Sequence, residues 1–154
     1  MPKIKIADAP RQAGTRYPPP FDKPCRDRSW LRLGDAAALT RFGVNLVRLP
    51  PGTWSSQRHW HSHEDEFVYI LEGELVLVTD EGEEILVAGD CAGFKAGDRN
   101  GHCLQNRSSR EARFLAVGSR HEDDYGEYPD IDLKFTANRS AAKGGFVHKD
   151  GSSY

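Results

Sequence analysis

Short runs of strand-forming residues, cut at regular intervals by turn formers, constrain the fold of this chain more than any other feature. Between residues 29 and 118 these runs recur roughly every eight to twelve residues, which is typical of a sandwich or small barrel. Turn signals such as Pro50-Pro51-Gly52 and Glu72-Gly73 separate them. The expected strands are Val44–Leu49, Gln57–His61, Glu66–Leu71, Glu74–Thr79, Glu84–Val87, Asp90–Phe94, His102–Asn106 and Arg113–Val117. The pattern predicts an all-β antiparallel fold.

The length of 154 residues favours one domain with two flanking segments. Residues 1–28 form an extended, proline-rich arm, and its aromatic residues Tyr17 and Phe21 indicate that it docks, for instance on a second subunit. Residues 29–118 form the barrel. A single helical turn is expected at residues 34–40, capped by Asp35. Residues 119–154 form a polar tail that packs in part on the barrel, and its acidic run, residues 122–124, is expected to be solvated.

Charge and composition narrow the range of partners. The formal net charge is −2, and no basic stripe marks a nucleic-acid partner. No apolar stretch approaches the length of a membrane span or of a signal-peptide core. The 3 cysteines are odd in number and scattered, which is typical of a reducing compartment. We therefore expect a cytoplasmic protein that binds neither nucleic acid nor membrane.

Two histidines and a glutamate occupy one predicted hairpin. His59 and His61 are two residues apart, so on a strand both side chains point to the same face. The chain then turns at residues 62–65 and returns through Glu66, which can lie beside the two imidazoles. Two imidazoles and one carboxylate suit non-haem iron, and also Mn, Ni, Cu and Zn.

A second segment, residues 89–106, offers a fourth ligand. His102 begins a strand after a turn rich in glycine, aspartate and asparagine, and it can reach the same centre from across the barrel. Three neutral histidines and one carboxylate leave a divalent ion with net positive charge and, in six-coordination, two open positions. Such an open arrangement is typical of a catalytic site rather than a structural one.

These two segments resemble the two motifs of the cupin family, in its small single-domain, metal-binding form. The first motif is matched by Gly52, His59, His61, Glu66 and Gly73, and the second by Gly89, Gly97, His102 and Asn106. The motifs span residues 52–106. The usual proline of the second motif is replaced here by Lys95, which is a turn residue and not a ligand.

The resemblance implies a single antiparallel cupin barrel, a double-stranded β-helix or jelly roll, with an irregular arm and tail. It implies one divalent ion, Fe, Mn, Ni or Zn, held by His59, His61, Glu66 and His102. It also implies a homodimer. A shared fold does not identify the reaction, which among cupins includes dioxygenation, sugar isomerisation and ligand sensing.

Five further residues are candidates for contact with a substrate or with the ligands. Gln57 shares the parity of His59, and Asn106 shares that of His102. His63 lies in the turn and is expected beside the ligands or at the surface. Lys95 at the barrel mouth can meet an anion but is better explained as a surface lysine. Arg48 can clamp an anion inside or flank the outer surface, and the second is favoured.

We interpret the chain as a metal-dependent enzyme acting on a small organic molecule. Val68, Ile70 and Leu104 are expected to make the cavity wall largely apolar, which slightly favours dioxygenase-type chemistry. Sugar or sugar-phosphate isomerisation is the alternative, supported by Lys95 and Arg48 as phosphate contacts. A third possibility is a non-catalytic sensor that binds a small molecule. No catalytic acid or base is assigned.

Overall fold

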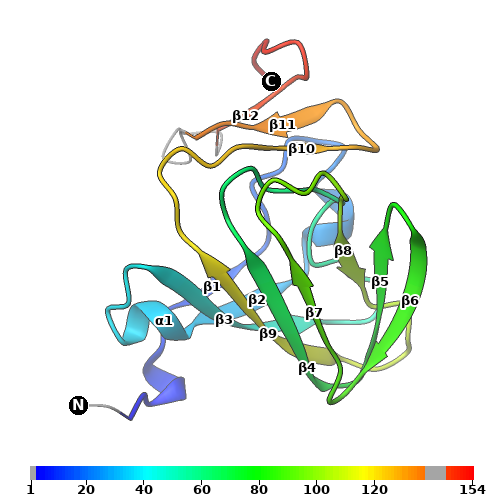
Figure 1. Ribbon diagram of the computed structural model, residues 1–154. Coiled ribbons are helices and arrows are strands. Elements are labelled where there is room, and N and C mark those ends of the chain that lie inside the picture. Colours follow the sequence, from blue (N-terminus) through cyan, green and yellow to red (C-terminus); the bar gives the residue numbers. More distant parts are fainter. Residues whose placement is uncertain (1–2, 138–144) are drawn as a thin grey trace.

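Two antiparallel sheets face each other and enclose the core in the computed structural model, which describes residues 3–137 and 145–154 (Figure 1). The larger sheet has the order β1 (Arg11–Ala13), β2 (Ser29–Arg32), β3 (Phe42–Leu49), β9 (Ala112–Ser119), β4 (Glu66–Glu72) and β7 (Cys91–Phe94). The smaller sheet has the order β6 (Gly82–Val87), β5 (Glu74–Thr79) and β8 (Cys103–Gln105). This arrangement confirms the predicted all-β jelly-roll barrel.

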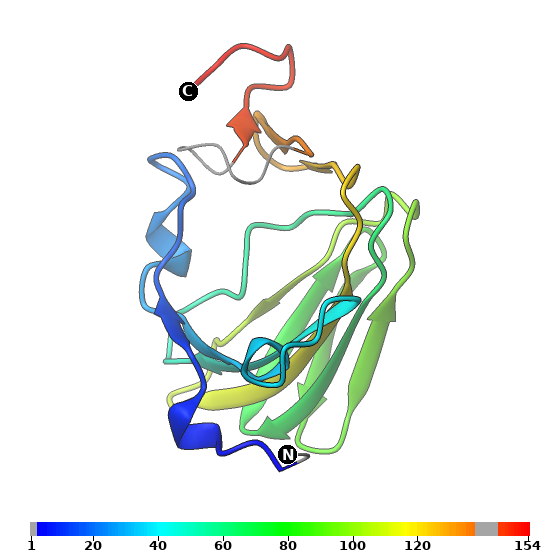
Figure 2. The same cartoon turned by 90° about the vertical axis from the view of Figure 1, so that its left-hand side faces the viewer.

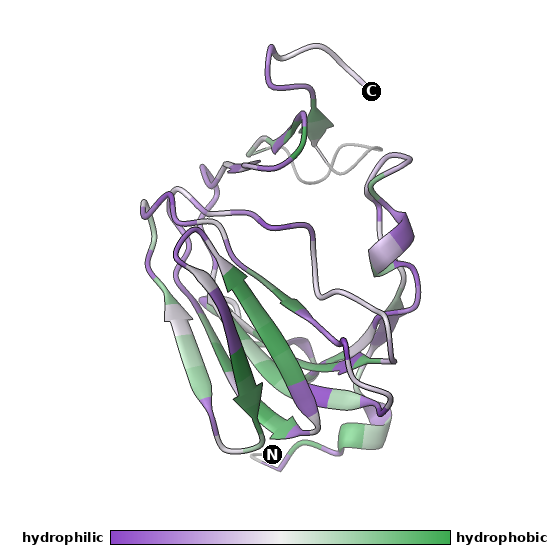
Figure 3. Ribbon diagram, turned by 90° about the vertical axis from the view of Figure 1, so that its right-hand side faces the viewer, coloured by the Kyte–Doolittle hydropathy of each residue, from purple (hydrophilic) through white to green (hydrophobic). Residues whose placement is uncertain are grey.

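The core lies between these sheets because each barrel strand presents alternate side chains to it. In β4, Val68 and Ile70 are buried, whereas Phe67 and Tyr69 remain exposed on the outer face. Each fully buried aliphatic side chain contributes about 1.5–3 kcal/mol to folding. Figure 3 shows the resulting pattern, with hydrophobic residues on the strands and polar residues on the connecting loops.

The N-terminal arm is part of the barrel sheet rather than a separate extension. Its strand β1 pairs antiparallel with β2, with Gln12 opposite Trp30. A short 3-10 helix, η1 (Ile6–Asp8), precedes β1, and a second one, η2 (Lys23–Cys25), follows it as the arm runs along the side of the barrel (Figure 2). Among the described residues the one α-helical turn is α1 (Leu33–Ala36), which is shorter than predicted, and Asp35 pairs with arginines instead of capping it.

The C-terminal tail forms a third sheet over one end of the barrel (Figures 1 and 2). This sheet consists of β10 (Gly126–Tyr128), β11 (Leu133–Phe135) and β12 (Phe146–Val147). Tyr128, Leu133 and Phe135 are buried and pack with Tyr17 and Cys25 of the arm in a second apolar cluster. The arm and the tail therefore meet at the end of the barrel.

The predicted strand Gln57–His61 is not formed. His59 makes a single bridge with His102, through bonds of 3.1 and 2.9 Å between their backbone groups. The next backbone donors, Trp60 and Ser62, bond instead to carbonyls of the tail, at 3.3 and 2.8 Å. No continuous ladder can form because the segment changes partners after His59.

Among the described helices, none combines the length and the apolar character needed to cross a membrane.

Candidate metal centre

Three histidines and one glutamate converge where the segment after residue 57 crosses the start of β4. Nε2 of His59 lies 3.1 Å from Nε2 of His61, and Nε2 of His102 lies 2.7 Å from Oε2 of Glu66. The same Glu66 oxygen is 3.4 Å from Nε2 of His61 and 3.7 Å from Nε2 of His59. The ligand atoms of His59, His61 and Glu66 lie within 4.8 Å of one another. The structure thus brings together the four residues proposed as ligands.

The hydrogen bonds of His59 and His61 determine which ring nitrogen is unprotonated. Nδ1 of His59 lies 2.9 Å from the carbonyl oxygen of Gln57, which can only accept, so Nδ1 carries the proton. Nδ1 of His61 lies 2.7 Å from Oδ2 of Asp124 and donates to it in the same way. In the neutral rings both Nε2 atoms then present lone pairs to each other. Lone pairs at 3.1 Å repel unless a cation or a proton lies between them, so this donor set fits a divalent ion.

Electrostatics keeps these groups in the protonation state that binds metal. Burial and, to a smaller extent, the positive charges of His102 and His61 lower the pKa of His59 to about 3, so the ring is neutral at pH 7. Burial opposes ionisation of Glu66. The hydrogen bond from His102 and the charges of His61 and His59 outweigh that effect and lower the pKa of Glu66. Neutral imidazole and ionised carboxylate are the forms that coordinate metal.

Packing fixes the ring of His102. The ring of Phe94 stacks on it with centroids 3.6 Å apart and an interplanar angle of 2°. Nδ1 of His102 is buried and has no hydrogen-bond partner among the described residues. Its Nε2 is therefore the nitrogen that makes the polar contact, toward Glu66.

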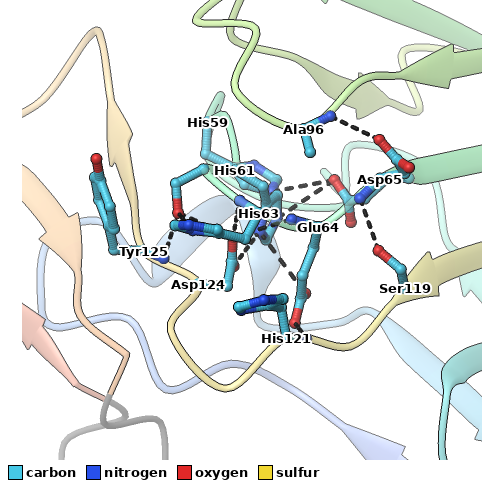
Figure 4. Close-up of polar contacts among 12 residues, drawn as sticks. His59, His61, His63, Glu64, Asp65, Ala96, Ser119, His121, Asp124 and Tyr125 are labelled. Carbon is cyan, nitrogen blue, oxygen red and sulfur yellow. Dashed lines mark hydrogen bonds and ion pairs between the residues drawn. The ribbon is translucent and has the colours of Figure 1, made fainter.

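Asp124 holds the loop that carries the centre. The acidic run to which it belongs, residues 122–124, is expected from the sequence to be solvated. Only 1% of Asp124 is exposed. Besides His61, its carboxylate accepts bonds from the backbone N–H of His63 (2.9 Å) and Glu64 (3.2 Å), as Figure 4 shows. One side chain of the tail thus orients a proposed ligand and the turn behind it. Nothing in the local sequence distinguishes Asp124 from its acidic neighbours.

Glu64 is a second residue near the centre that the sequence did not single out. It is buried, and it lines the cavities beside His61 and Glu66. Its Oε1 accepts a bond of 3.0 Å from the backbone N–H of His121 (Figure 4). Glu64 lies in the turn before β4, where the alternation used to place side chains does not apply.

The five candidate contact residues lie outside the centre. Asn106 is buried and ties the backbone carbonyls of Leu49 and Arg110 together. Gln57 donates to the carbonyl of Phe21 in the arm, and His63 is exposed and stacks on His121. The remaining two face different surroundings, since Arg48 pairs with Glu111 on the outer face and Lys95 is exposed at an acidic opening.

Hollows reach the centre from two sides. On the β5–β6 side a cavity of about 370 Å³ touches His61, Glu66 and His102 and is lined by several acidic residues. On the arm side an inner hollow of about 320 Å³ continues into an outer one of about 810 Å³, and Arg28 and Asn45 line both. Val68 and Leu104 line the inner hollow as predicted, but arginines and amides make the arm side more polar than the expected apolar wall.

Comparisons with known proteins agree on the fold. A family model described as Cupin domain matches residues 45–118. A protein from Silicibacter pomeroyi DSS-3, named a sugar phosphate isomerase from a cupin superfamily, is 47% identical with a TM-score of 0.90, over 99% of this chain and 96% of that one. A search of curated proteins found no match.

Two further solved structures are similar over a smaller share of the chain. A protein from Acidithiobacillus ferrooxidans ATCC 23270, provisionally given the same isomerase activity, is 28% identical with a TM-score of 0.70, over 79% of this chain and 74% of that one. The polyketide cyclase RemF from Streptomyces resistomycificus is 21% identical with a TM-score of 0.61, over 77% and 79% of the two chains. The latter likeness shows the fold alone.

Proposed function

This chain belongs to the cupin superfamily, and from that premise we propose that it is a divalent-metal-dependent enzyme that isomerises a sugar phosphate. The observation that carries the proposal is that the unprotonated Nε2 atoms of His59 and His61 and the carboxylate of Glu66 converge at the end of a polar cavity. The likeness along nearly the whole chain to a protein named a sugar phosphate isomerase supports the choice of reaction.

The proposed ligands are His59, His61, Glu66 and His102, and Fe, Mn, Ni and Zn all suit this set. A bound divalent ion supplies Lewis-acid polarisation of the sugar oxygens. Asp124 holds His61 in the tautomer that binds metal, and Phe94 holds the ring of His102 in place.

Glu64 is the proposed base. Isomerisation of an aldose to a ketose moves one proton from C2 to the carbonyl carbon C1 and the C2 hydroxyl proton to the former carbonyl oxygen, so it needs no oxidant and consumes no water. The carboxylate of Glu64 would take the proton from the carbon next to the carbonyl and return it to the neighbouring carbon. Glu64 is buried and lines the same cavity as Glu66, so it can reach a substrate bound there.

A largely apolar cavity wall slightly favours oxygenase-type chemistry. The observed wall is more polar than expected, so this argument for an oxygenase is weaker. The arm side of the cavity presents Arg28 and Asn45 beside the apolar residues. A charged and hydroxylated substrate suits such a lining better than an apolar one does. A sensor role without turnover remains the third possibility and is an outcome of the experiment below.

The predicted cytoplasmic location and homodimer belong to the same proposal. The three cysteines are free thiols, which supports a reducing compartment. Phe67, Tyr69 and Leu71 are exposed together on the outer face of β4, which supports pairing of two subunits there. Light scattering of the purified protein tests the dimer, and a monomer at all concentrations would contradict it.

The function is tested with untagged protein whose metal content is measured before assay. Phosphorylated aldoses and ketoses are incubated with it in D2O, and NMR follows both conversion and deuterium at the carbon beside the carbonyl. We expect about one divalent ion per chain and conversion of at least one sugar phosphate. Glu64→Gln should retain the ion and lose conversion by about 10²-fold or more.

Three results would contradict the proposal. Metal-loaded protein that converts no sugar phosphate of the panel would leave a binding module. Oxygen consumption with an organic substrate would favour the oxygenase instead. Full activity in Glu64→Gln would remove that residue from the proton transfer.

A further inference from the structure

The two openings of the centre carry opposite charge. The opening on the β5–β6 side is lined by Glu81, Glu83, Glu84 and Asp98, with Lys95 as the one cation among its described lining residues. The arm-side opening is lined by four arginines, Arg16, Arg28, Arg32 and Arg120. Glu64 and Glu66 lie at the inner end of both. An anionic substrate is therefore repelled on one side and attracted on the other.

Arg28 lies between the opening and the centre. It lines the inner hollow, which reaches His59, Glu66 and His102, and also the outer one. Its Nε donates to the carbonyl of Gly14 at 2.9 Å, and its Nη1 donates to the carbonyl of Ser55. Among the described residues no hydrogen bond uses its Nη2. The guanidinium is thus oriented by the backbone and retains donors for a ligand.

Two aromatic rings lie beside this guanidinium. Its central carbon is 5.7 Å from the ring centroid of Tyr17 and 5.3 Å from that of Trp30. The rings displace water from the guanidinium, which strengthens a charge-assisted bond to an anion. Arg28 is half-buried, so its geometry is far more restricted than that of a surface arginine.

Two arginines at the rim share one carboxylate. Arg120 Nη2 lies 2.6 Å from Oδ1 of Asp35, and Arg32 pairs with the other oxygen of the same group. The carboxylate balances only one of these two cations, and Arg28 adds further positive charge. The rim therefore keeps a positive excess that draws an anion inward toward Arg28.

We infer that the arm-side cavity binds the phosphate of the substrate, with Arg28 as the principal contact and Arg32 beside it. The inference rests on the proposed function and deepens it. A phosphate on Arg28 leaves the carbonyl end of the sugar directed to Glu64 and the metal ligands. Arg48 and Lys95, the phosphate contacts considered from the sequence, lie elsewhere. The arm that carries β1 and Tyr17 thus forms one wall of the phosphate site.

The test compares Arg28→Gln with the matched control Arg48→Gln on the outer sheet face. Calorimetry measures binding of inorganic phosphate to metal-loaded protein, and metal content and thermal unfolding show whether each variant is intact. We expect Arg28→Gln to weaken phosphate binding by at least about tenfold, and Arg48→Gln to leave it unchanged. Arg28→Lys should recover only part of the affinity because the planar fork is lost. Arg32→Gln should weaken binding less, and it is the test variant if Arg28→Gln does not fold.

Steady-state kinetics then separates this inference from the proposed function. We expect Arg28→Gln to raise KM for the phosphorylated sugar far more than KM for the same sugar without phosphate. Unchanged phosphate affinity in folded Arg28→Gln would overturn the phosphate site. So would a wild-type protein that isomerises the phosphorylated and the unphosphorylated sugar equally well. In both cases the proposed isomerase activity would stand. Phosphate binding that depends on Arg28, without turnover of any sugar, would support the site and contradict the isomerase.

Discussion

At the scale of single residues, the centre depends on where a few protons lie. The carbonyl of Gln57 and the carboxylate of Asp124 each fix a proton on Nδ1 of a histidine, and this leaves two Nε2 lone pairs facing each other. That arrangement costs stability in the absence of a cation. A metal site is often built in this way, with its outer hydrogen bonds preparing the ligands.

Removal of a proposed ligand should release the ion. We expect His61→Ala and Glu66→Ala to lose nearly all bound metal, because each removes a donor atom of the centre. His63→Ala should keep about one ion per chain, since His63 is exposed and stacks on His121. Elemental analysis of the three variants measures this, and equal loss in all three would show that the turn is wrongly assigned.

Replacement of Asp124 should weaken binding of the ion indirectly, through His61. Asp124→Asn keeps the shape but removes the charge that holds His61 and the following turn. We expect metal affinity to fall by about 10–100-fold, the usual cost of losing such a partner. Competition with a chelator measures the affinity. Asp123→Asn is the matched control because Asp123 is exposed, and an equal effect there would argue against the role of Asp124.

At the scale of elements, the tail sheet is tied to the segment that carries the histidines. Gly126 in β10 lies so close to this segment that a Cβ there would overlap the carbonyl oxygen of Trp60. It would also lie 2.6 Å from the ring of Phe135. No side chain fits, so the contact between β10 and the segment requires glycine.

Gly126→Ala should therefore destabilise the protein. We expect a loss of about 1–3 kcal/mol, the usual cost of overpacking, because backbone and a buried ring must both move. Thermal or urea unfolding measures it. Gly93→Ala is the control, since a Cβ at Gly93 meets only the Glu66 carbonyl oxygen at 3.9 Å. Equal stability of the two variants would mean that the tail sheet adjusts freely.

At the scale of the whole molecule, the second apolar cluster and the barrel bury a tyrosine hydroxyl and two cysteine thiols in their neutral, protonated form. Burial raises the pKa of Tyr17 to about 12 and that of Cys25 and Cys103 to about 11. The unfolded chain loses these protons at lower pH than the folded protein does. Their contribution to stability is thus complete below about pH 9 and declines as pH rises toward 11 or 12.

The protein should accordingly become less stable in alkaline solution. We expect the free energy of unfolding to fall by on the order of 2 kcal/mol between about pH 8 and pH 10. Urea titrations in the presence of a reductant measure it. Cys25→Ala and Cys103→Ala should each flatten the decline, and an unchanged slope in the double variant would contradict this origin.

The sequence by itself determined the barrel and the identity of the four converging residues. Strand periodicity and turn spacing are local properties, so they placed Val68 and Ile70 in the core and brought Glu66 beside His61. The strand expected at residues 57–61 does not form, yet its histidines still converge. The bridge from His59 to His102 and the bond from His61 to Asp124 replace the missing ladder.

Only the tertiary structure decided what surrounds these residues. Asp124 reaches His61 across 63 positions of the chain, and Glu64 lies in a turn where alternation gives no direction. Arg28 lines the cavity because the arm pairs with the barrel sheet. The pairing of β2 with β3 leaves Arg48 on the outer face, where it pairs with Glu111. Such contacts depend on which distant segments pack together, and local periodicity carries no information about that packing.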